Sequence, residues 1–304
     1  MSTNPIYAFE HAPTGTLVRA HTHSERLQVL RKDAEGRFHE VASFDAHSNH
    51  QLGYADGVVV FPDARGRATL LDLRALEDGP QPAPRGLRVL LDEARGLLLS
   101  DPRFPYEAPD GTTPTGLLVV SVAEGRVLER WAGLDGDVAR IEPFGRPSTS
   151  SRPMGAFAED SFEIVVADDR KTWALVAAQR VVIGCGAETF ARLEWTGPQT
   201  FPPMASLDPS RRRLIICASA GVAAVGFDGT VEASWSGPAK PLSPALVDGD
   251  ELLVVVAEPT TKSSALGEPR WTRVVRLDAE SLRPRGDHEI GRLRDPGDQA
   301  ALLR

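Results

Sequence analysis

The amino-acid sequence predicts an all-β fold built from repeated four-stranded units. Three observations lead to this prediction. Short apolar runs recur along the whole chain and are separated by turn residues such as Asp-Gly. A unit repeats at a fixed spacing, so that Asp168 and Trp195 recur as Asp208 and Trp235. No segment shows the apolar period of an amphipathic helix.

The clearest unit runs from Met204 to Trp235. Its four expected strands read MASL, RLIICAS, VAAVGF and TVEASW. They are separated by Asp208-Pro209-Ser210, by Gly221 and by Asp228-Gly229, which are residues that tight turns favour. This stretch therefore predicts four consecutive antiparallel strands.

The other units follow the same pattern. In chain order they are Ile6 to Phe44, Leu52 to Pro82, Arg88 to Trp131, Glu163 to Trp195 and Pro244 to Ile290. The first reads YAFE, TLVRAHT, RLQVLRK and FHEVASF, and the third reads RVLL, LLLS, LLVVSV and VLERW. Turns are expected at Asp56-Gly57 in the second unit and at Asp248-Gly249-Asp250 in the last.

Four-stranded units that repeat about every forty to fifty residues are typical of β-propeller blades. The sequence thus predicts a β-propeller with six four-stranded blades. Residues 132–162 do not fit the pattern and are expected to form an excursion or a degenerate seventh blade. We expect residues 1–304 to form a single domain, with the ring closed by pairing of the N- and C-terminal blades.

The segments LLVVSVAEGRVLERW and AAVGFDGTVEASW resemble the repeats of quinoprotein-like and YVTN/WD40-like propellers. The resemblance covers most of the chain at the level of the superfamily. It implies that Trp131, Trp195 and Trp235 pack between neighbouring blades. A quinone cofactor is not implied, because the paired neighbouring cysteines of some quinoproteins are missing, and the chain contains no Trp-Asp dipeptide.

Composition limits the partners and the compartment. The net charge of -8 argues against nucleic acid and against an anionic membrane surface. No apolar run has the length of a membrane span, and we expect a cytoplasmic protein. Cys185 and Cys217 both adjoin apolar strand residues and are expected to be small buried side chains.

The lengths of the connections distinguish the two faces of the predicted propeller. The turns that join strands A and B, and strands C and D, are short throughout. The long connections are the B–C loops 101–115 and 258–270 and the D–A connection 132–162. All three are expected to project from one face. Long loops often carry function, although surface loops are also tolerated at little cost.

Histidines gather near the same face. His21 and His23 end a B strand, whereas His47 and His50 lie on the following D–A connection with Asp45 nearby. Neutral imidazoles and a carboxylate can bind one divalent metal ion such as zinc. The alternative is that these are ordinary exposed histidines in polar turns, since their spacing matches no established zinc pattern.

Two other groups stand out. The aromatic residues Phe104, Tyr106 and Trp271 lie in or beside the long loops and could anchor a partner, or they could pack locally within the loops. The triplet Arg211-Arg212-Arg213 lies in a tight turn on the opposite face, where we expect three solvated charges.

These patterns favour a non-catalytic binding scaffold that recognises a protein or a small-molecule ligand through its loop-rich face and needs no cofactor. The alternative is a metal-dependent hydrolase or lyase of the lactonase or streptogramin-lyase kind. Its metal ligands would be His21, His23, His47 and His50, with Asp45 as a further ligand or base.

Overall fold

The structure is a computed structural model of the chain. It describes residues 6–21, 25–47, 53–102, 105–133, 135–144, 163–177, 180–195, 204–218, 220–237, 240–241, 244–257 and 271–292. These residues belong to two compact units, which we call the N-terminal unit (Asn4–Asp135) and the C-terminal unit (Gly136–Arg304).

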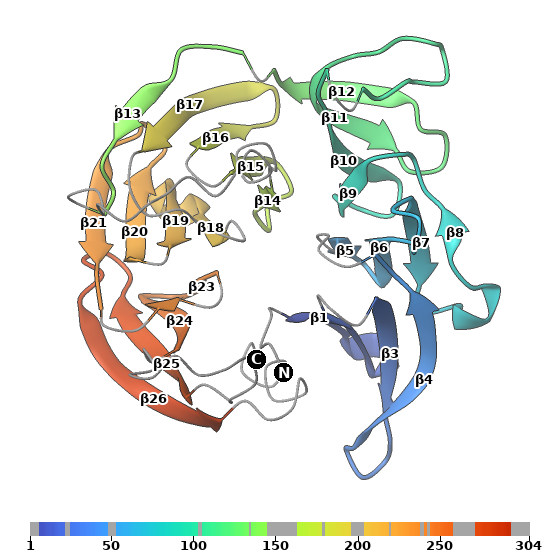
Figure 1. Cartoon of the computed structure of the whole chain (residues 1–304), viewed down its shortest axis with the longest axis horizontal. Coiled ribbons are helices and arrows are strands. Elements are labelled where there is room, and N and C mark those ends of the chain that lie inside the picture. Colours follow the sequence, from blue (N-terminus) through green and yellow to red (C-terminus); the bar gives the residue numbers. More distant parts are fainter. Residues whose placement is uncertain are drawn as a thin grey trace. The chain divides into compact units, whose positions relative to one another are not determined.

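The N-terminal unit contains three antiparallel four-stranded sheets, drawn in blue to green in Figure 1. In each sheet the strands follow one another in chain order, as the repeat predicts. The first sheet has β1 (Ile6–His11), β2 (Thr16–His21), β3 (Arg26–Lys32) and β4 (Phe38–Asp45); the second has β5 (Gly53–Ala55), β6 (Val58–Pro62), β7 (Ala68–Asp72) and β8 (Gln81–Pro82); the third has β9 (Leu87–Leu90), β10 (Arg95–Ser100), β11 (Gly116–Ser121) and β12 (Val127–Ala132).

The C-terminal unit contains the other three sheets. The fourth has β13 (Ala139–Ile141), β14 (Glu163–Val166), β15 (Thr172–Val176), β16 (Arg180–Cys185) and β17 (Glu188–Trp195); the fifth has β18 (Met204–Asp208), β19 (Arg213–Ala218), β20 (Gly221–Gly226) and β21 (Val231–Trp235); the sixth has β22 (Lys240–Pro241), β23 (Leu246–Asp248), β24 (Glu251–Ala257), β25 (Trp271–Asp278) and β26 (Pro284–Arg292).

These six sheets correspond to the six predicted units and are blades of the β-propeller type. The predicted all-β fold class is therefore confirmed. Closure of the ring and a single domain stay predictions. Residues 132–162 do not add a sheet within the described part of the chain. Instead, Ala132 ends β12, and β13 joins the fourth sheet.

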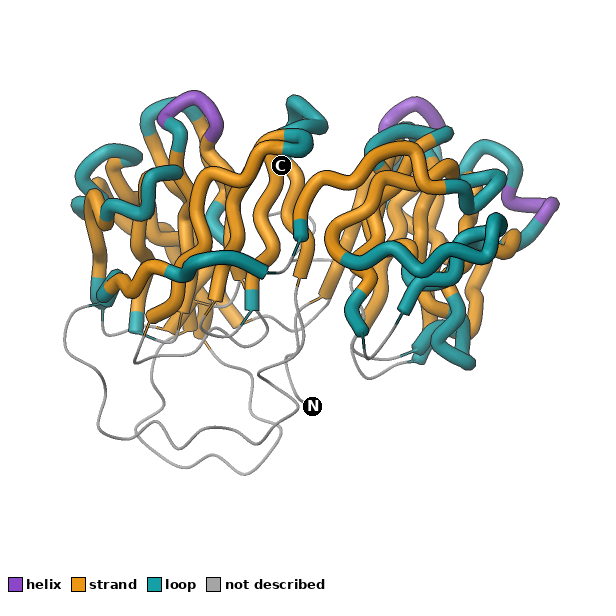
Figure 2. The backbone as a smooth tube through the Cα atoms, turned by 90° about the horizontal axis from the view of Figure 1, so that it is seen from above, coloured by secondary structure: helices purple, strands orange, loops and turns teal. Residues whose placement is uncertain are grey.

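Only short 3-10 turns interrupt the strands among the described residues: η1 (Ala12–Thr14), η2 (Leu76–Asp78) and η3 (Pro209–Arg211), shown in purple in Figure 2. Each lies in a turn between the first and second strands or the third and fourth strands of its sheet. No helix in the described part of the chain is long and apolar enough to cross a membrane.

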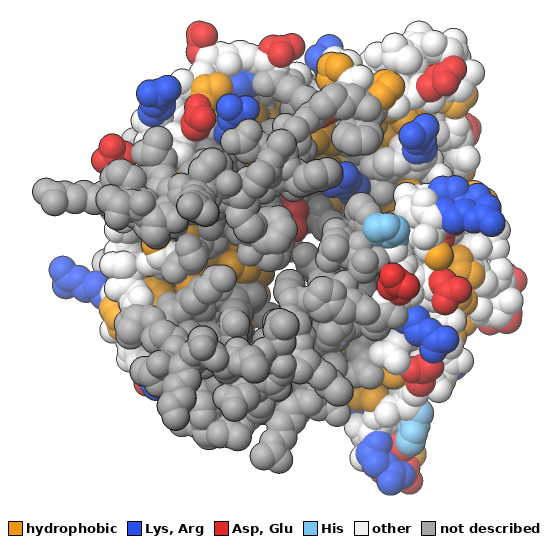
Figure 3. Space-filling view, in the orientation of Figure 1, with side chains coloured by type: hydrophobic (Ala, Val, Ile, Leu, Met, Phe, Trp, Pro, Cys, Tyr) orange, Lys and Arg blue, Asp and Glu red, His pale blue; other side chains and the backbone are white. Residues whose placement is uncertain are grey.

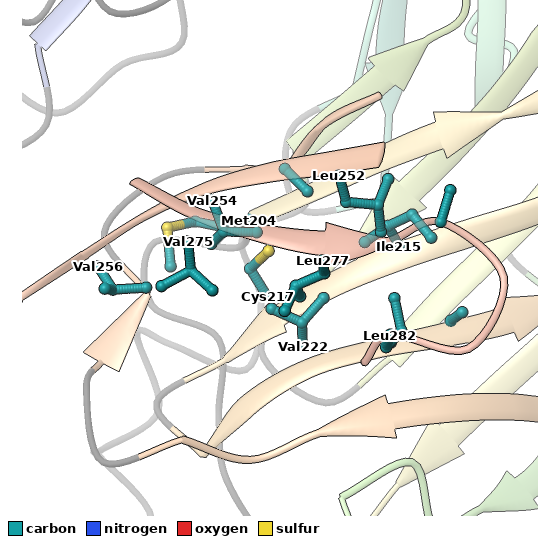
Figure 4. Packing of buried hydrophobic residues seen from close by; sticks show 13 residues of the cluster. Met204, Ile215, Cys217, Val222, Leu252, Val254, Val256, Val275, Leu277 and Leu282 are labelled. Carbon is teal, nitrogen blue, oxygen red and sulfur yellow. The ribbon is translucent and has the colours of Figure 1, made fainter. Parts of the chain in front are cut away.

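The apolar cores lie between consecutive sheets within each unit. Every residue of β15, β19 and β20 is buried, because both faces of these strands are covered by neighbouring elements. Figure 4 shows the cluster between the fifth and sixth sheets, which includes Ile215, Cys217 and Leu252. A similar cluster joins the fourth and fifth sheets; we call it the fourth–fifth core.

The tryptophans and cysteines lie within or beside these cores. Trp195 is buried in the fourth–fifth core, and Trp235 packs against the cluster between the fifth and sixth sheets, as the propeller resemblance implied. Trp131 is also buried, and its ring N–H donates to Glu129. Both cysteines are free; Cys185 is half-buried, whereas complete burial raises the pKa of the Cys217 thiol to about 12.

Candidate functional site

The two ends of each sheet are built differently. In naming the ends we count the four consecutive strands of each repeat and leave out β13 and β22. The short-turn end carries the turns between the first and second strands and between the third and fourth strands. The loop end carries the connection between the second and third strands and the exit to the next sheet. At the short-turn ends an aspartate usually closes the turn by accepting backbone N–H groups. Asp92 accepts from Ala94 and Arg95, and Asp278 accepts from Glu280 and Ser281.

An arginine that follows such an aspartate often completes the turn. The Arg95 guanidinium lies 2.7 Å from Asp92, and Arg37 lies 3.2 Å from Asp33. Burial tends to raise the pKa of Asp92, but the hydrogen bonds from Arg95 and Ala94 outweigh it and lower the pKa. These short turns are therefore held by local ion pairs and hydrogen bonds.

The arginine triplet corrects one prediction. Arg213 is a buried residue, and its Nε lies 3.3 Å from the equally buried Asp208. A second nitrogen of Arg213 donates to the carbonyl of Ala279 in the sixth sheet. The expectation of three solvated charges is thus wrong for Arg213. Asp208 and Arg213 are cross-strand partners in β18 and β19, and this pairing brings the carboxylate to the guanidinium.

The other two arginines also have defined contacts. Arg211 lies 3.3 Å from Asp208 and 2.9 Å from Asp250, which belongs to a turn of the sixth sheet. Arg212 has a left-handed backbone (φ 52°), and its guanidinium lies 5.4 Å from the centre of the Phe190 ring. The triplet therefore holds neighbouring sheets together, which the isolated sequence motif does not reveal.

The loop end of the N-terminal unit carries two of the predicted site residues. The chain beyond β4 stays extended, because the Ala46 N–H donates to the Glu25 carbonyl (2.9 Å) and the His47 N–H donates to the Pro62 carbonyl (3.0 Å). Ala46 is buried, whereas Asp45 and His47 are exposed. Because side chains alternate along an extended chain, Asp45 and His47 lie on the same side of it.

A compact turn of the second sheet borders this segment. Ala46 forms a bridge with Asp63, and the Asp63 carboxylate accepts the backbone N–H groups of Arg65 (2.8 Å) and Arg67 (2.9 Å). These hydrogen bonds, together with the ion pair to Arg67, lower the pKa of Asp63. We define the exposed corner as Asp45, His47 and Arg65, three exposed side chains on backbone that is fixed by these bonds.

The four-histidine site is only partly placed. His21 ends β2, but its side chain lies outside the described residues, as do His23 and His50. Within the described part of the chain, no group of three or more histidine, cysteine or acidic residues is arranged to hold a metal. The metal site therefore stays a prediction, to which the structure contributes the shared orientation of Asp45 and His47.

Tyr106 corrects a second prediction. Its side chain is buried, its N–H donates to the Ser100 hydroxyl (2.9 Å), and its hydroxyl donates to the Gly125 carbonyl. Gly125 belongs to the turn between β11 and β12, at the short-turn end. This part of loop 101–115 thus runs back along the third sheet instead of projecting from it. Tyr106 therefore packs locally instead of anchoring a partner, because its ring belongs to the core between the second and third sheets.

The two other aromatic candidates are not tested. Phe104 lies outside the described residues. Trp271 begins β25, but its side chain is outside the described part of the structure. Figure 3 shows acidic and basic side chains mixed on the visible face of the N-terminal unit.

Comparison with known proteins gives the fold alone. The chain matches no known protein family and no curated protein. Among solved structures it is similar to the computationally designed Ika8 protein, with a TM-score of 0.51 and 13% identity over 94% of this chain and 73% of that one. It also aligns with BamB from Moraxella catarrhalis, with a TM-score of 0.45 and 10% identity over 95% of this chain and 76% of that one.

Proposed function

We propose that the protein is a non-catalytic binding scaffold that recognises a partner protein through the loop ends of its sheets. The observation that carries this proposal is the exposed corner at the loop end of the N-terminal unit. There Asp45, His47 and Arg65 lie at the surface on hydrogen-bonded connections between strands. Binding residues are often carried in this way on connections that a rigid scaffold positions.

The exposed corner has the properties of a preorganised recognition surface. Its backbone is fixed by the hydrogen bonds of Ala46, His47 and Asp63, so little conformational freedom is lost when a partner binds. Asp45 and Arg65 present opposite charges, which favours a partner surface with complementary charges of both signs. A protein surface fits this pattern better than a nucleic acid, whose phosphates carry one sign of charge.

Charge-neutral substitutions test the proposal. The variant Asp45→Ala/His47→Ala/Arg65→Ala removes the exposed corner and keeps the net charge. The matched control Glu124→Ala/Arg126→Ala removes one acid and one base from an exposed turn at a short-turn end of the same unit. We expect affinity purification with quantitative mass spectrometry to recover a specific partner with the unmodified and control proteins, and at least about tenfold less with the corner variant. Equal recovery by all three proteins would contradict the proposal.

The catalytic alternative rests on Asp45 and His47 sharing one side of the chain. A metal-dependent hydrolase or lyase requires a divalent ion, which can be measured in protein purified without a His tag. Stoichiometric metal that is lost in a His47→Ala/His50→Ala variant would favour this alternative over the scaffold. A protein that contains no metal would contradict the catalytic alternative.

A further inference from the structure

The fourth sheet has an additional parallel strand at its outer edge. β13 joins its outer edge and runs parallel to β17, with Ala139, Arg140 and Ile141 opposite Leu193, Glu194 and Trp195. All other strand pairs in the described part of the chain are antiparallel. In Figure 1, β13 follows β17 on the outside of the sheet, after the chain has left β12.

Few side chains anchor this added strand. Ile141 and Phe144 pack against the fourth–fifth core, and Pro143 between them is buried. By contrast, Ala139, Arg140 and Glu142 are exposed, and Val138 is 50% exposed. The segment therefore binds as an extended peptide does, with backbone bonds along the edge and a short apolar motif, Ile-x-Pro-Phe, that faces the core.

The receiving edge is longer than its occupant. β17 has eight residues, and β13 pairs with only the last three. The outer edge of a sheet is a template for strand addition, and a short parallel pair is held less strongly than a long antiparallel one. Local opening that releases β13 therefore requires much less than unfolding of the sheet.

We propose that the outer edge of β17 is a docking site for an extended segment of a partner protein, and that β13 is the chain's own occupant of this site. The partner segment adds parallel to β17, with an aliphatic residue opposite Trp195 and an aromatic residue three positions later, as Ile141 and Phe144 do. The exposed position that directly follows the aliphatic residue, held here by Glu142, accepts a polar residue. This site lies in the C-terminal unit, so it is independent of the exposed corner in the N-terminal unit.

The experiment uses the full chain and a labelled peptide that copies residues 137–144, Asp-Val-Ala-Arg-Ile-Glu-Pro-Phe. The double variant Ile141→Asp/Phe144→Ser releases the internal strand and leaves β17 intact. The matched control is Val138→Asp, which adds the same charge at an exposed position of the same segment. Fluorescence anisotropy measures peptide binding, and circular dichroism checks that each protein is folded.

We expect the double variant to bind the peptide at least about tenfold more tightly than the unmodified protein and the Val138→Asp control, because the internal competitor no longer occupies the edge. A peptide with the same Ile-to-Asp and Phe-to-Ser changes should not bind. A folded double variant that binds both peptides equally, or neither, would overturn the proposal.

A second measurement covers the case in which the double variant does not fold. Hydrogen exchange of the unmodified protein is followed with the peptide in large excess. Displacement predicts faster exchange of the amides in residues 139–141, while the amides of 193–195 stay protected. Unchanged exchange in residues 139–141 at saturating peptide would overturn the proposal.

Discussion

The fourth and fifth sheets have similar sequences, but different interactions stabilise the turn between β14 and β15 and the turn between β18 and β19. Thr172 begins β15 and Arg213 begins β19, and each contacts an aspartate in or beside the turn that precedes its strand. The Thr172 hydroxyl donates to Asp169 over 2.6 Å, whereas the Arg213 guanidinium lies 3.3 Å from Asp208 and also reaches Ala279 in the sixth sheet. A neutral hydrogen bond closes one turn locally, and a buried ion pair joins the other turn to the next sheet.

The largest difference between the two sheets is expected from the variant Asp208→Ala. It removes the buried carboxylate beside Arg213 and leaves only the more distant, less buried carboxylate of Glu232 at 3.7 Å. Breaking a buried ion pair costs about 3–5 kcal/mol. Equilibrium urea unfolding of the full chain, followed by tryptophan fluorescence, measures this loss.

Asp250→Ala is the control for this variant. Asp250 pairs with Arg211, but its side chain is 84% exposed, so we expect a loss of at most about 1 kcal/mol. If both variants lost the same free energy of unfolding, the burial of the Asp208–Arg213 pair would not matter to stability.

A second contrast concerns the second residue of β15 and of β19 and the residue opposite each on the next strand. Trp173 is opposite Gly184 in the fourth sheet, whereas Leu214 is opposite Val225 in the fifth. A Cβ atom at Gly184 would lie 2.4 Å from the Trp173 ring and 2.3 Å from the carbonyl oxygen of Glu188. The large ring thus requires a residue without a side chain beside it.

We expect Gly184→Ala to reduce the free energy of unfolding by about 1–3 kcal/mol, because overpacking displaces the ring and the carbonyl. Trp173→Leu/Gly184→Ala moves the pair toward the fifth-sheet arrangement. A double-mutant cycle in urea should show that the combined loss is smaller than the sum of the single losses. Additive losses would show that the Glu188 carbonyl alone excludes a side chain at this position.

These contrasts show why the sequence predicted the sheets but not their connections. Strand positions follow from local signals, such as the apolar runs of β19 and β20 and the turn residues Asp228-Gly229, so all six units are found. The burial of Arg213 depends on a carbonyl that is 66 residues away in the chain. β13 is too short to have a recognisable apolar period, and only its position beside β17 makes it a strand.

The candidate site was predictable to a similar extent. The connection after β4 predicts that Asp45 and His47 lie at the loop end, because the order of strands determines the end of the sheet. The sequence leaves open whether Tyr106 projects with its long loop or packs locally, and the structure shows that its ring is buried in the core between the second and third sheets. An aromatic residue between prolines in a long loop could have signalled this packing.

Acid should weaken both turns, and the fifth more than the fourth. Burial tends to raise the pKa of both Asp169 and Asp208, but hydrogen bonds outweigh it and lower both values, with the charges of Arg213 and Arg211 adding to the effect at Asp208. A carboxylate whose pKa is lowered on folding stabilises the protein above its unfolded pKa of about 3.9, and this contribution is lost as the pH falls through the folded pKa.

Urea midpoints measured between about pH 6 and pH 2 test this expectation. The unmodified protein should lose stability below about pH 4. Asp208→Asn should flatten this dependence more than Asp169→Asn does, because the principal partner of Asp169 is a neutral hydroxyl. The reverse order would show that the ion pair contributes less to stability than the local hydrogen bond.

The smallest effect is expected at the hydroxyl of Thr172. Thr172→Val keeps the shape of the side chain but removes the donor to Asp169, and the net loss of one such hydrogen bond is about 1 kcal/mol. Thr172→Ser keeps the hydroxyl and is the matched control in urea unfolding. Asp169 still accepts the backbone N–H groups of Lys171 and Thr172, so the turn itself should persist. A loss as large as that of Asp208→Ala would mean that the local turn, and not the contact with the neighbouring sheet, determines the stability of both sheets.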